Sequence, residues 1–112
     1  MRVQIELQAI PNQTASVLLN DQECEIQVRQ MGNRLFMSLS VDDDVIFKNV
    51  LCPIAAPING AEVLGFLGVL FFLDTKGKDD PQWEELGSRW LLFYASPDDD
   101  MYQELMDARN LH

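Results

Sequence analysis

The sequence predicts a mainly β domain that ends in one short helix, with its strands arranged as an antiparallel meander, a small β-barrel or a sandwich. Three observations predict this class. Apolar and polar residues alternate with period two in several stretches of the first half. Two runs rich in aromatic and apolar residues, 63–73 and 89–94, follow in the second half. Clusters of Gly, Pro, Asp and Asn, typical of turns, separate these stretches.

The first two strands are predicted from alternation and from the breaks that follow it. Residues 3–7 alternate as a half-buried strand does, and residues 11–13 are expected to end that strand. A second strand is expected over residues 14–19. Asn20 and Asp21 then supply a turn, because both residues tolerate turn conformations.

The next strands continue the pattern and complete an antiparallel meander. The turns are expected at residues 31–33 and 42–44, and another strand begins at residues 45–47. In the strand before the first of these turns and in the strand after it, every second residue is apolar and is expected to face the core. These residues are Cys24, Ile26 and Val28, followed by Leu35, Met37, Leu39 and Val41.

An irregular crossing is predicted over residues 53–60. Pro53 and Pro57 have no backbone donor and so cannot join a strand ladder. The uncharged run 63–73 that follows is predicted to be a central strand covered on both faces, in which one of two glycines marks a bulge or a close backbone approach. The run is shorter than the roughly 20 apolar residues that a membrane helix needs.

A polar loop at residues 74–81 precedes Arg89, which begins the second apolar run. A charged side chain at the start of a buried strand is costly unless it has a partner. Asp74, Asp79 and Asp80 are the nearby acids, so we expect an ion pair that holds the loop rather than a catalytic role. The residues predicted to fix this structural loop are Asp74, Gly77, Asp80, Pro81, Gly87 and Arg89.

A short helix is predicted to close the chain. Ser96 is the expected N-cap, Pro97 the first helical residue, and the acids that follow suit the helix dipole. The apolar stripe of this helix would consist of Met101, Tyr102, Leu105 and Met106.

Length, charge and cysteine content set further bounds. The 112 residues, of which 47% are hydrophobic, suffice for a single domain over residues 1–112. The chain begins without the apolar segment of a secretory signal, so cytoplasmic synthesis is expected. A net charge of −10 disfavours specific nucleic-acid binding. No apolar stretch is long enough to span a membrane, so no membrane partner is expected. Cys24 and Cys52 are expected to be buried free thiols rather than a disulfide.

The sequence predicts no active site and no cofactor or metal site. The single histidine is His112, the last residue, where a catalytic pair is difficult to assemble. The triplets at 42–44 and 98–100 are explained by a turn and a helix start rather than by calcium. In the loop, Lys76 and Lys78 occupy positions at which a cation site would need oxygen ligands. We therefore expect a protein that is not an enzyme.

The sequence resembles the baseplate plug family of contractile-tailed bacteriophages and prophages, over nearly its whole length. The segments that carry the resemblance are residues 3–7 and 10–13, 51–52 and 64–68, and most specifically 74–83 and 86–94. The resemblance implies a structural virion component at the lower end of the tail tube in the baseplate. It would join the hub and tail-tube proteins in several copies around the tail axis, three or six being suited to a tube.

Symmetric assembly requires that copies share apolar surface. The interface candidates lie outside the regular alternation; they are Phe66, Trp83, Pro53 and Pro57. The acidic composition suits a conduit through which DNA slides, and free sheet edges can add strands from neighbours.

The same features fit a small cytoplasmic β-barrel that binds a ligand or acts as an adaptor. Visible edges would favour assembly, whereas a closed barrel around a cavity would favour the ligand binder.

Overall fold

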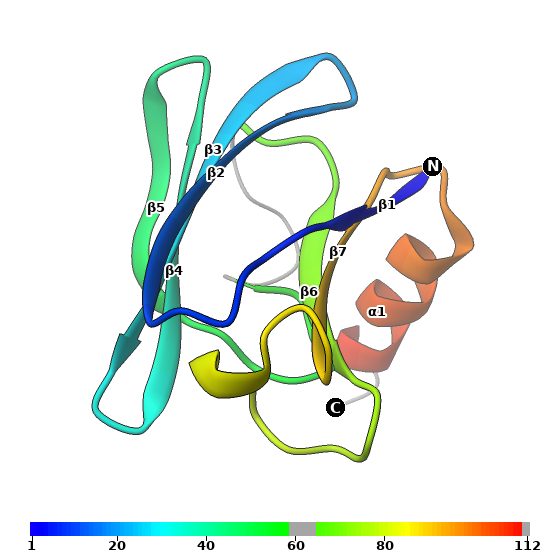
Figure 1. Ribbon diagram of the computed structural model, residues 1–112. Coiled ribbons are helices and arrows are strands. Elements are labelled where there is room, and N and C mark those ends of the chain that lie inside the picture. Colours follow the sequence, from blue (N-terminus) through cyan, green and yellow to red (C-terminus); the bar gives the residue numbers. More distant parts are fainter. Residues whose placement is uncertain (59–64, 111–112) are drawn as a thin grey trace.

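The computed structural model describes residues 1–58 and 65–110 (Figure 1). These residues form seven strands, one 3-10 helix and one α-helix. Their bounds are β1 Arg2–Ile5, β2 Asn12–Leu19, β3 Gln22–Met31, β4 Arg34–Val41, β5 Asp44–Leu51, β6 Val69–Asp74, η1 Trp83–Glu85, β7 Trp90–Ala95 and α1 Asp100–Asn110. The predicted class, mainly β with a short C-terminal helix, is therefore confirmed.

Strands β2 to β5 form a four-stranded antiparallel sheet in that order, which is the predicted meander. Two-residue turns at Asn20-Asp21 and Asp42-Asp43 close its first and last hairpins, with φ between 49° and 70° at all four positions. Asn and Asp tolerate this left-handed region, which suits the twist of a hairpin. β2 begins at Asn12, earlier than predicted. Of the residues 11–13 that were expected to break the strand, only Pro11 lacks a backbone N–H, and Asn12 already pairs with Arg29 of β3.

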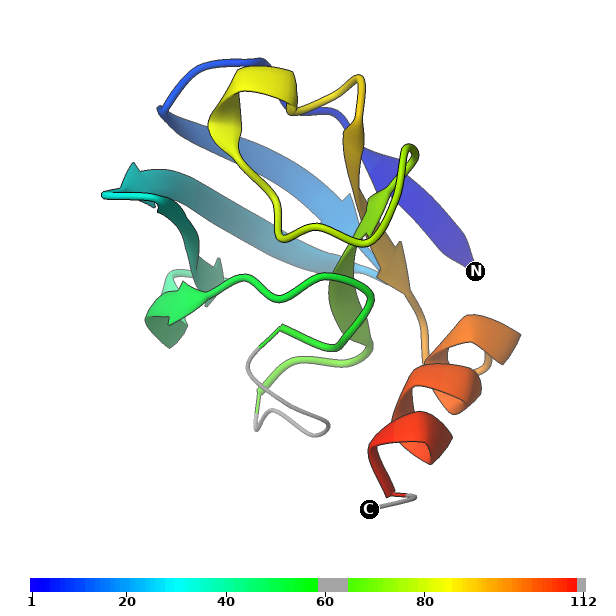
Figure 2. The same ribbon diagram turned by 90° about the horizontal axis from the view of Figure 1, so that it is seen from below.

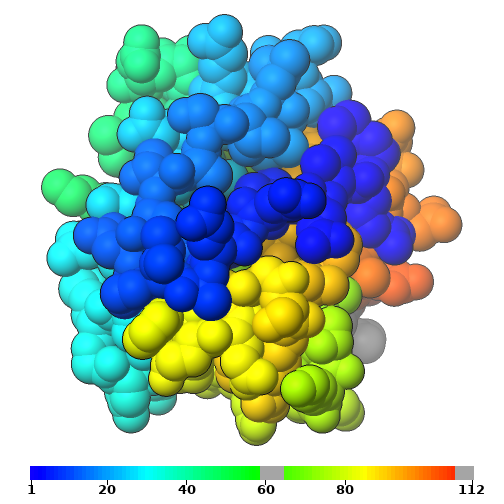
Figure 3. Space-filling model, viewed as in Figure 1, coloured from blue at the N-terminus to red at the C-terminus, as the bar shows by residue number. Residues whose placement is uncertain are grey.

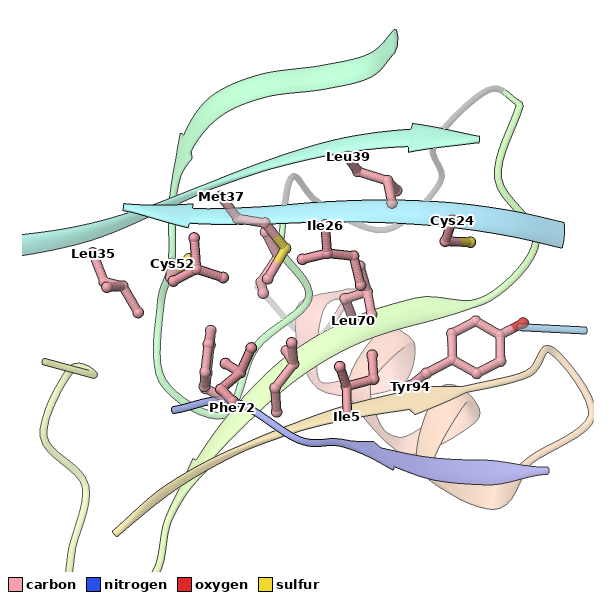
Figure 4. Packing of buried hydrophobic residues seen from close by; sticks show 14 of the residues in the cluster. Ile5, Cys24, Ile26, Leu35, Met37, Leu39, Cys52, Leu70, Phe72 and Tyr94 are labelled. Atoms are coloured by element: carbon pink, nitrogen blue, oxygen red, sulfur yellow. The ribbon is translucent and has the colours of Figure 1, made fainter. Parts of the chain in front are cut away.

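Strands β1, β7 and β6 form a second antiparallel sheet with β7 in the middle. The two sheets pack face to face, and their apolar side chains fill the space between them (Figure 4). Helix α1 covers the other face of the second sheet (Figures 1 and 2). The described strands thus form an open sandwich, not a closed barrel. The residues that meet between the sheets include Leu70, Phe72 and Tyr94 from one sheet and Ile26, Met37 and Leu39 from the other.

The predicted central strand 63–73 is wrong in two respects. The strand begins only at Val69, because Gly65 and Gly68 have φ of 91° and 114° and turn the chain away from an extended path. Residues 63 and 64 of the prediction lie outside the described residues. β6 is also a flanking strand, since β7 occupies the centre. Its coverage on both faces is as predicted: Leu70 and Phe72 face the core between the sheets, and Phe71 faces α1.

The predicted irregular crossing runs along the edge of β6. The amides of Ala55 and Ile58 donate to the carbonyl oxygens of Phe72 and Leu70, over 2.8 and 2.9 Å. The two donors are three residues apart, whereas a strand would bond its neighbour from every second residue. Pro53 and Pro57 have no backbone N–H to add. Within the described part, the crossing is irregular as predicted and covers the β6 edge; residues 59 and 60 of the predicted stretch lie outside the described residues.

The predicted cap of the terminal helix is wrong. Helix α1 begins at Asp100, and Asp99 caps it, because its carboxylate accepts from the amide of Met101 over 2.9 Å. Ser96 instead hydrogen-bonds to Met1 and Asp98, so its hydroxyl is engaged before the helix starts. The apolar stripe is as predicted. Its residues Met101, Tyr102, Leu105 and Met106 pack on the second sheet.

Candidate functional site: the held loop and the sheet surfaces

Arg89 holds the loop between β6 and β7. Its Nε and Nη2 donate to Oδ1 and Oδ2 of Asp74, the last residue of β6, over 2.8 and 2.9 Å. Nη2 also donates to Oδ2 of Asp79 over 2.8 Å. The Asp74 side chain is fully buried, and that of Arg89 is 19% exposed. Two parallel hydrogen bonds from a planar guanidinium fix the orientation of the buried carboxylate.

The loop is folded around the Asp74 carboxylate. The amides of Lys76 and Asp79 donate to its two oxygens over 2.9 and 3.0 Å. The Arg89 guanidinium lies 4.2 Å from the centre of the Trp90 ring, a cation–π distance. Trp90 Nε1 in turn donates to the carbonyl oxygen of Asp79 over 3.0 Å. Both strands that flank the loop therefore contribute to its shape.

The other residues predicted for this loop occupy different environments. Pro81 is fully buried. A methyl group at Gly77 would meet only ordinary contacts, whereas at Gly87, with φ of 85°, it would lie 2.3 Å from the carbonyl oxygen of Leu7. Asp80 forms no ion pair within the described part of the chain. The close approach at Gly87 ties the loop to the segment that leads from β1 to β2.

Acidification is expected to open this loop only well below the pH at which ordinary carboxylates titrate. Hydrogen bonds from Arg89 are the main cause that lowers the pKa of Asp74 far below its usual range. A carboxylate whose pKa is lowered by folding adds stability above its unfolded pKa of about 3.9 and loses that contribution as the pH falls toward the folded pKa. An NMR titration of the Asp74 carboxyl group and the Lys76 amide measures the midpoint. In Arg89→Met the midpoint is expected to rise; an unchanged midpoint would contradict this assignment.

The predicted interface residues differ in exposure. Phe66 is 7% exposed and packs edge-on against Tyr94, with 5.7 Å between the ring centres. Pro57 is also buried within the chain. Pro53 and Trp83 are half-buried and keep part of their apolar surface accessible. Of the four, these last two present surface on the outside of the chain.

The outer face of the β2–β5 sheet carries features that the sequence reasoning missed. Leu18 and Val45 are apolar but 62% and 69% exposed. A hollow of about 610 Å³ opens on this face, lined by Ser16, Val17, Leu18, Glu23, Cys24, Glu25, Ser40, Asp42 and Asp43. One signal was available, because Leu18 and Leu19 are adjacent in a strand and only one of two neighbours can face the core.

The described side chains offer little reactive chemistry. In residues 1–58 and 65–110, no three His, Cys, Asp or Glu side chains lie where they could hold a metal ion. Burial is the main cause that raises the pKa of the free thiols of Cys24 and Cys52, to about 11 and about 12. Such thiols stay protonated at neutral pH and are poor nucleophiles. Over the same ranges, no helix has the length and apolar character that a membrane span requires.

Comparison with known families identifies the chain. The sequence profile described as cyanophage baseplate Pam3 plug gp18 matches residues 2–98. The matched region contains both sheets and the loop held by Arg89, and among the described elements only α1 lies beyond it. A search of curated proteins found no match. Because the matched region covers most of the chain, this protein belongs to the phage baseplate plug family of cyanophage Pam3 gp18.

Proposed function

We propose that this protein is a structural, non-enzymatic plug at the lower end of a contractile phage tail, where several copies surround the tail axis and contact the hub and tail-tube proteins. The observation that carries the proposal is the family match over residues 2–98, because the family is that of a baseplate plug. In this proposal the chain is synthesised in the host cytoplasm and becomes part of the virion. Three or six copies would suit the symmetry of a tube.

The polar chemistry of the chain supports a structural role. Both oxygens of Asp74 accept hydrogen bonds from Arg89 and from amides of the same loop. This buried carboxylate is therefore engaged in holding the loop closed rather than in transferring protons. The protonated, buried thiols of Cys24 and Cys52 fit the same reading.

The charge of the chain supports a position beside the DNA conduit. A net charge of −10 repels the phosphate backbone, so a wall made of such subunits would let DNA pass without binding it. The alternative, a small cytoplasmic β-barrel that binds a ligand, needs a sheet closed around a cavity. The two described sheets instead do not close into a barrel and so keep edge strands, which favours assembly.

The predicted interface residues would serve contacts between copies in two ways. Trp83 and Pro53 offer partly exposed apolar surface, as interface anchors do. Phe66 and Pro57 lie beneath the surface and would support the shape of the segments around them. We assign the copy-to-copy contact to the regions of Trp83 and Pro53.

Cryo-electron microscopy of purified phage particles tests the proposal. Density for this chain is expected at the lower end of the tail tube, repeated around the tail axis. Mass spectrometry of the same particles provides the decisive control, because it detects the chain whether or not it is ordered. Particles that lack the chain would refute the proposed function.

A further inference from the structure

Four strand edges bound the two sheets in the described part of the chain, and three of them are covered, short or irregular. The β6 edge takes hydrogen bonds from the backbone of Ala55 and Ile58. β1 has only four residues. β5 has two register shifts against β4 and a φ of 52° at Asn49. Short strands, covers and bulges keep edges from pairing with other chains. β2 is neither short nor covered nor bulged: its eight residues pair with β3 in unbroken register.

The turn after β2 determines which of its backbone groups point outward. In a hairpin closed by two residues, the flanking pair, here Leu19 and Gln22, exchanges hydrogen bonds, and the pattern then alternates along the strand. The residues whose N–H and C=O groups point away from β3 are therefore Asn12, Thr14, Ser16 and Leu18. The described residues provide no hydrogen-bond partner for these groups, and all four residues are exposed. β2 thus presents a regular row of free donors and acceptors.

The side chains along this edge are uncharged and incompletely covered. β2 contains no charged residue, although 23% of the chain is charged. Its inward-facing Ala15 and Val17 are only half-buried, whereas Ile26 on the neighbouring strand is 0% exposed. Figure 3 views this side and shows the N-terminal segments, in blue, covering part of the surface. A strand added beside β2 would bind the free backbone groups and cover these apolar side chains.

The hollow beside β2 indicates the charge of the added strand. Ser16 and Leu18 of β2 line it together with four acids, Glu23, Glu25, Asp42 and Asp43. Within the described part of the chain, none of these acids forms an ion pair. A Lys or Arg side chain carried by the added strand would be attracted to this position.

A second copy of this chain is a poor occupant of the edge. Its own β2 is uncharged and is flanked by the same acids, so two such edges would bring like charges together on chains that each carry −10. Its β5 edge is bulged and does not match the regular β2 edge. Charge therefore disfavours the β2 edge of a second copy, and irregular pairing disfavours its β5 edge, so a different protein is favoured.

We propose that β2 binds an extended segment of another baseplate protein as a fifth strand of the β2–β5 sheet, with a Lys or Arg of that segment in the acidic hollow. The inference rests on the proposed function and deepens it, because it specifies the surface and the chemistry of the partner. Copies of this chain then meet elsewhere, at the regions of Trp83 and Pro53.

Hydrogen exchange in the isolated chain and in the intact particle tests this inference. The amides of Thr14, Ser16 and Leu18 are expected to exchange rapidly in the isolated chain and about 100-fold or more slowly in the particle, because an added strand would hydrogen-bond them. Equal exchange in the two states would overturn the inference. The two proposals remain distinguishable, since a chain absent from the particle refutes the function, whereas a chain present with unprotected β2 amides refutes only the docking strand.

Two proline variants separate docking from folding. Ser16→Pro removes an outward N–H and leaves the β2–β3 bonds in place, so it is expected to fold but to be incorporated into particles at least about ten-fold less. Val45→Pro is the matched control, because Val45 also lies in an outward-pointing position, but on the bulged β5 edge. Thermal melts establish that both variants fold; if Ser16→Pro does not, Leu18→Lys tests the same edge without changing the backbone. Normal incorporation of a folded β2 variant would overturn the inference.

Cross-linking in the particle identifies the occupant. A lysine-to-carboxylate cross-linker is expected to join Glu23 or Glu25 to an extended segment of a different baseplate protein. Cross-links from these acids to a second copy of this chain would overturn the choice of partner. Loss of these cross-links in Ser16→Pro particles, with others retained, would support the docking of the segment on β2.

Discussion

Gly87→Ala is expected to lower the free energy of unfolding by about 2–5 kcal/mol. Two effects combine at this position. An alanine held at positive φ costs about 1–2 kcal/mol, and overpacking a fixed site costs about 1–3 kcal/mol more. Gly87 has φ of 85°, and its added Cβ would lie 2.3 Å from the carbonyl oxygen of Leu7. Because that oxygen belongs to the backbone, the loop and the segment between β1 and β2 must move apart to relieve the contact.

Gly77→Ala in the same region provides the matched control. Its added Cβ would lie 3.5 Å from Asp74 Oδ2, an ordinary contact, and it has no positive φ to strain. Such a substitution is expected to change stability by less than about 1 kcal/mol, in either direction. Urea unfolding of both variants, at unchanged slope, measures the difference. Equal stabilities for the two variants would contradict the close approach at Gly87.

Much of the first sheet could be predicted because one physical rule governs it. A strand with one face on the core must alternate, so Ile26 and Met37 could be assigned to the core from spacing alone, and the structure buries both at 0% exposure. The partner of Arg89 could also be anticipated, because a charge at the start of a buried strand needs a nearby acid. In both cases the residues that determine the local structure are close in the sequence or recur at a regular period.

The errors arise where distant segments compete for the same residue. Ser96 and Pro97 carry the pattern of a helix start, but the Ser96 hydroxyl is engaged by Met1, which is 95 positions away. The run 63–73 carries no alternation, and its two glycines predicted a bulge or a close approach but not that the strand begins only at Val69. The positive φ of Gly65 and Gly68 breaks the strand there, and Gln22 holds the segment between them: its side chain accepts from the Leu67 amide over 2.9 Å and donates to the Leu67 carbonyl oxygen over 3.1 Å. No local pattern connects residues 45 positions apart.

Tyr94→Ala is expected to lower the free energy of unfolding by about 3–5 kcal/mol, the usual range for removing a large aromatic side chain from a core. Tyr94 is 0% exposed in the middle strand of its sheet and contacts Phe66 edge-on. Its ring also occupies the space next to Gly68, where an added Cβ would lie 2.4 Å from it. Without the ring, the segment before β6 loses the surface on which it packs, and a cavity remains.

Tyr94→Phe separates the ring from its hydroxyl group. The hydroxyl donates to the carbonyl oxygen of Leu67, but Gln22 Nε2 donates to the same oxygen, so the acceptor keeps one partner. We therefore expect a loss of only about 0.5–1.5 kcal/mol, the net value of a single hydrogen bond. Amide exchange at Leu67 would show whether its segment loosens, and denaturant unfolding would give the total change. A Phe variant as unstable as the Ala variant would mean that the hydroxyl, rather than the packing of the ring, holds this segment on β7.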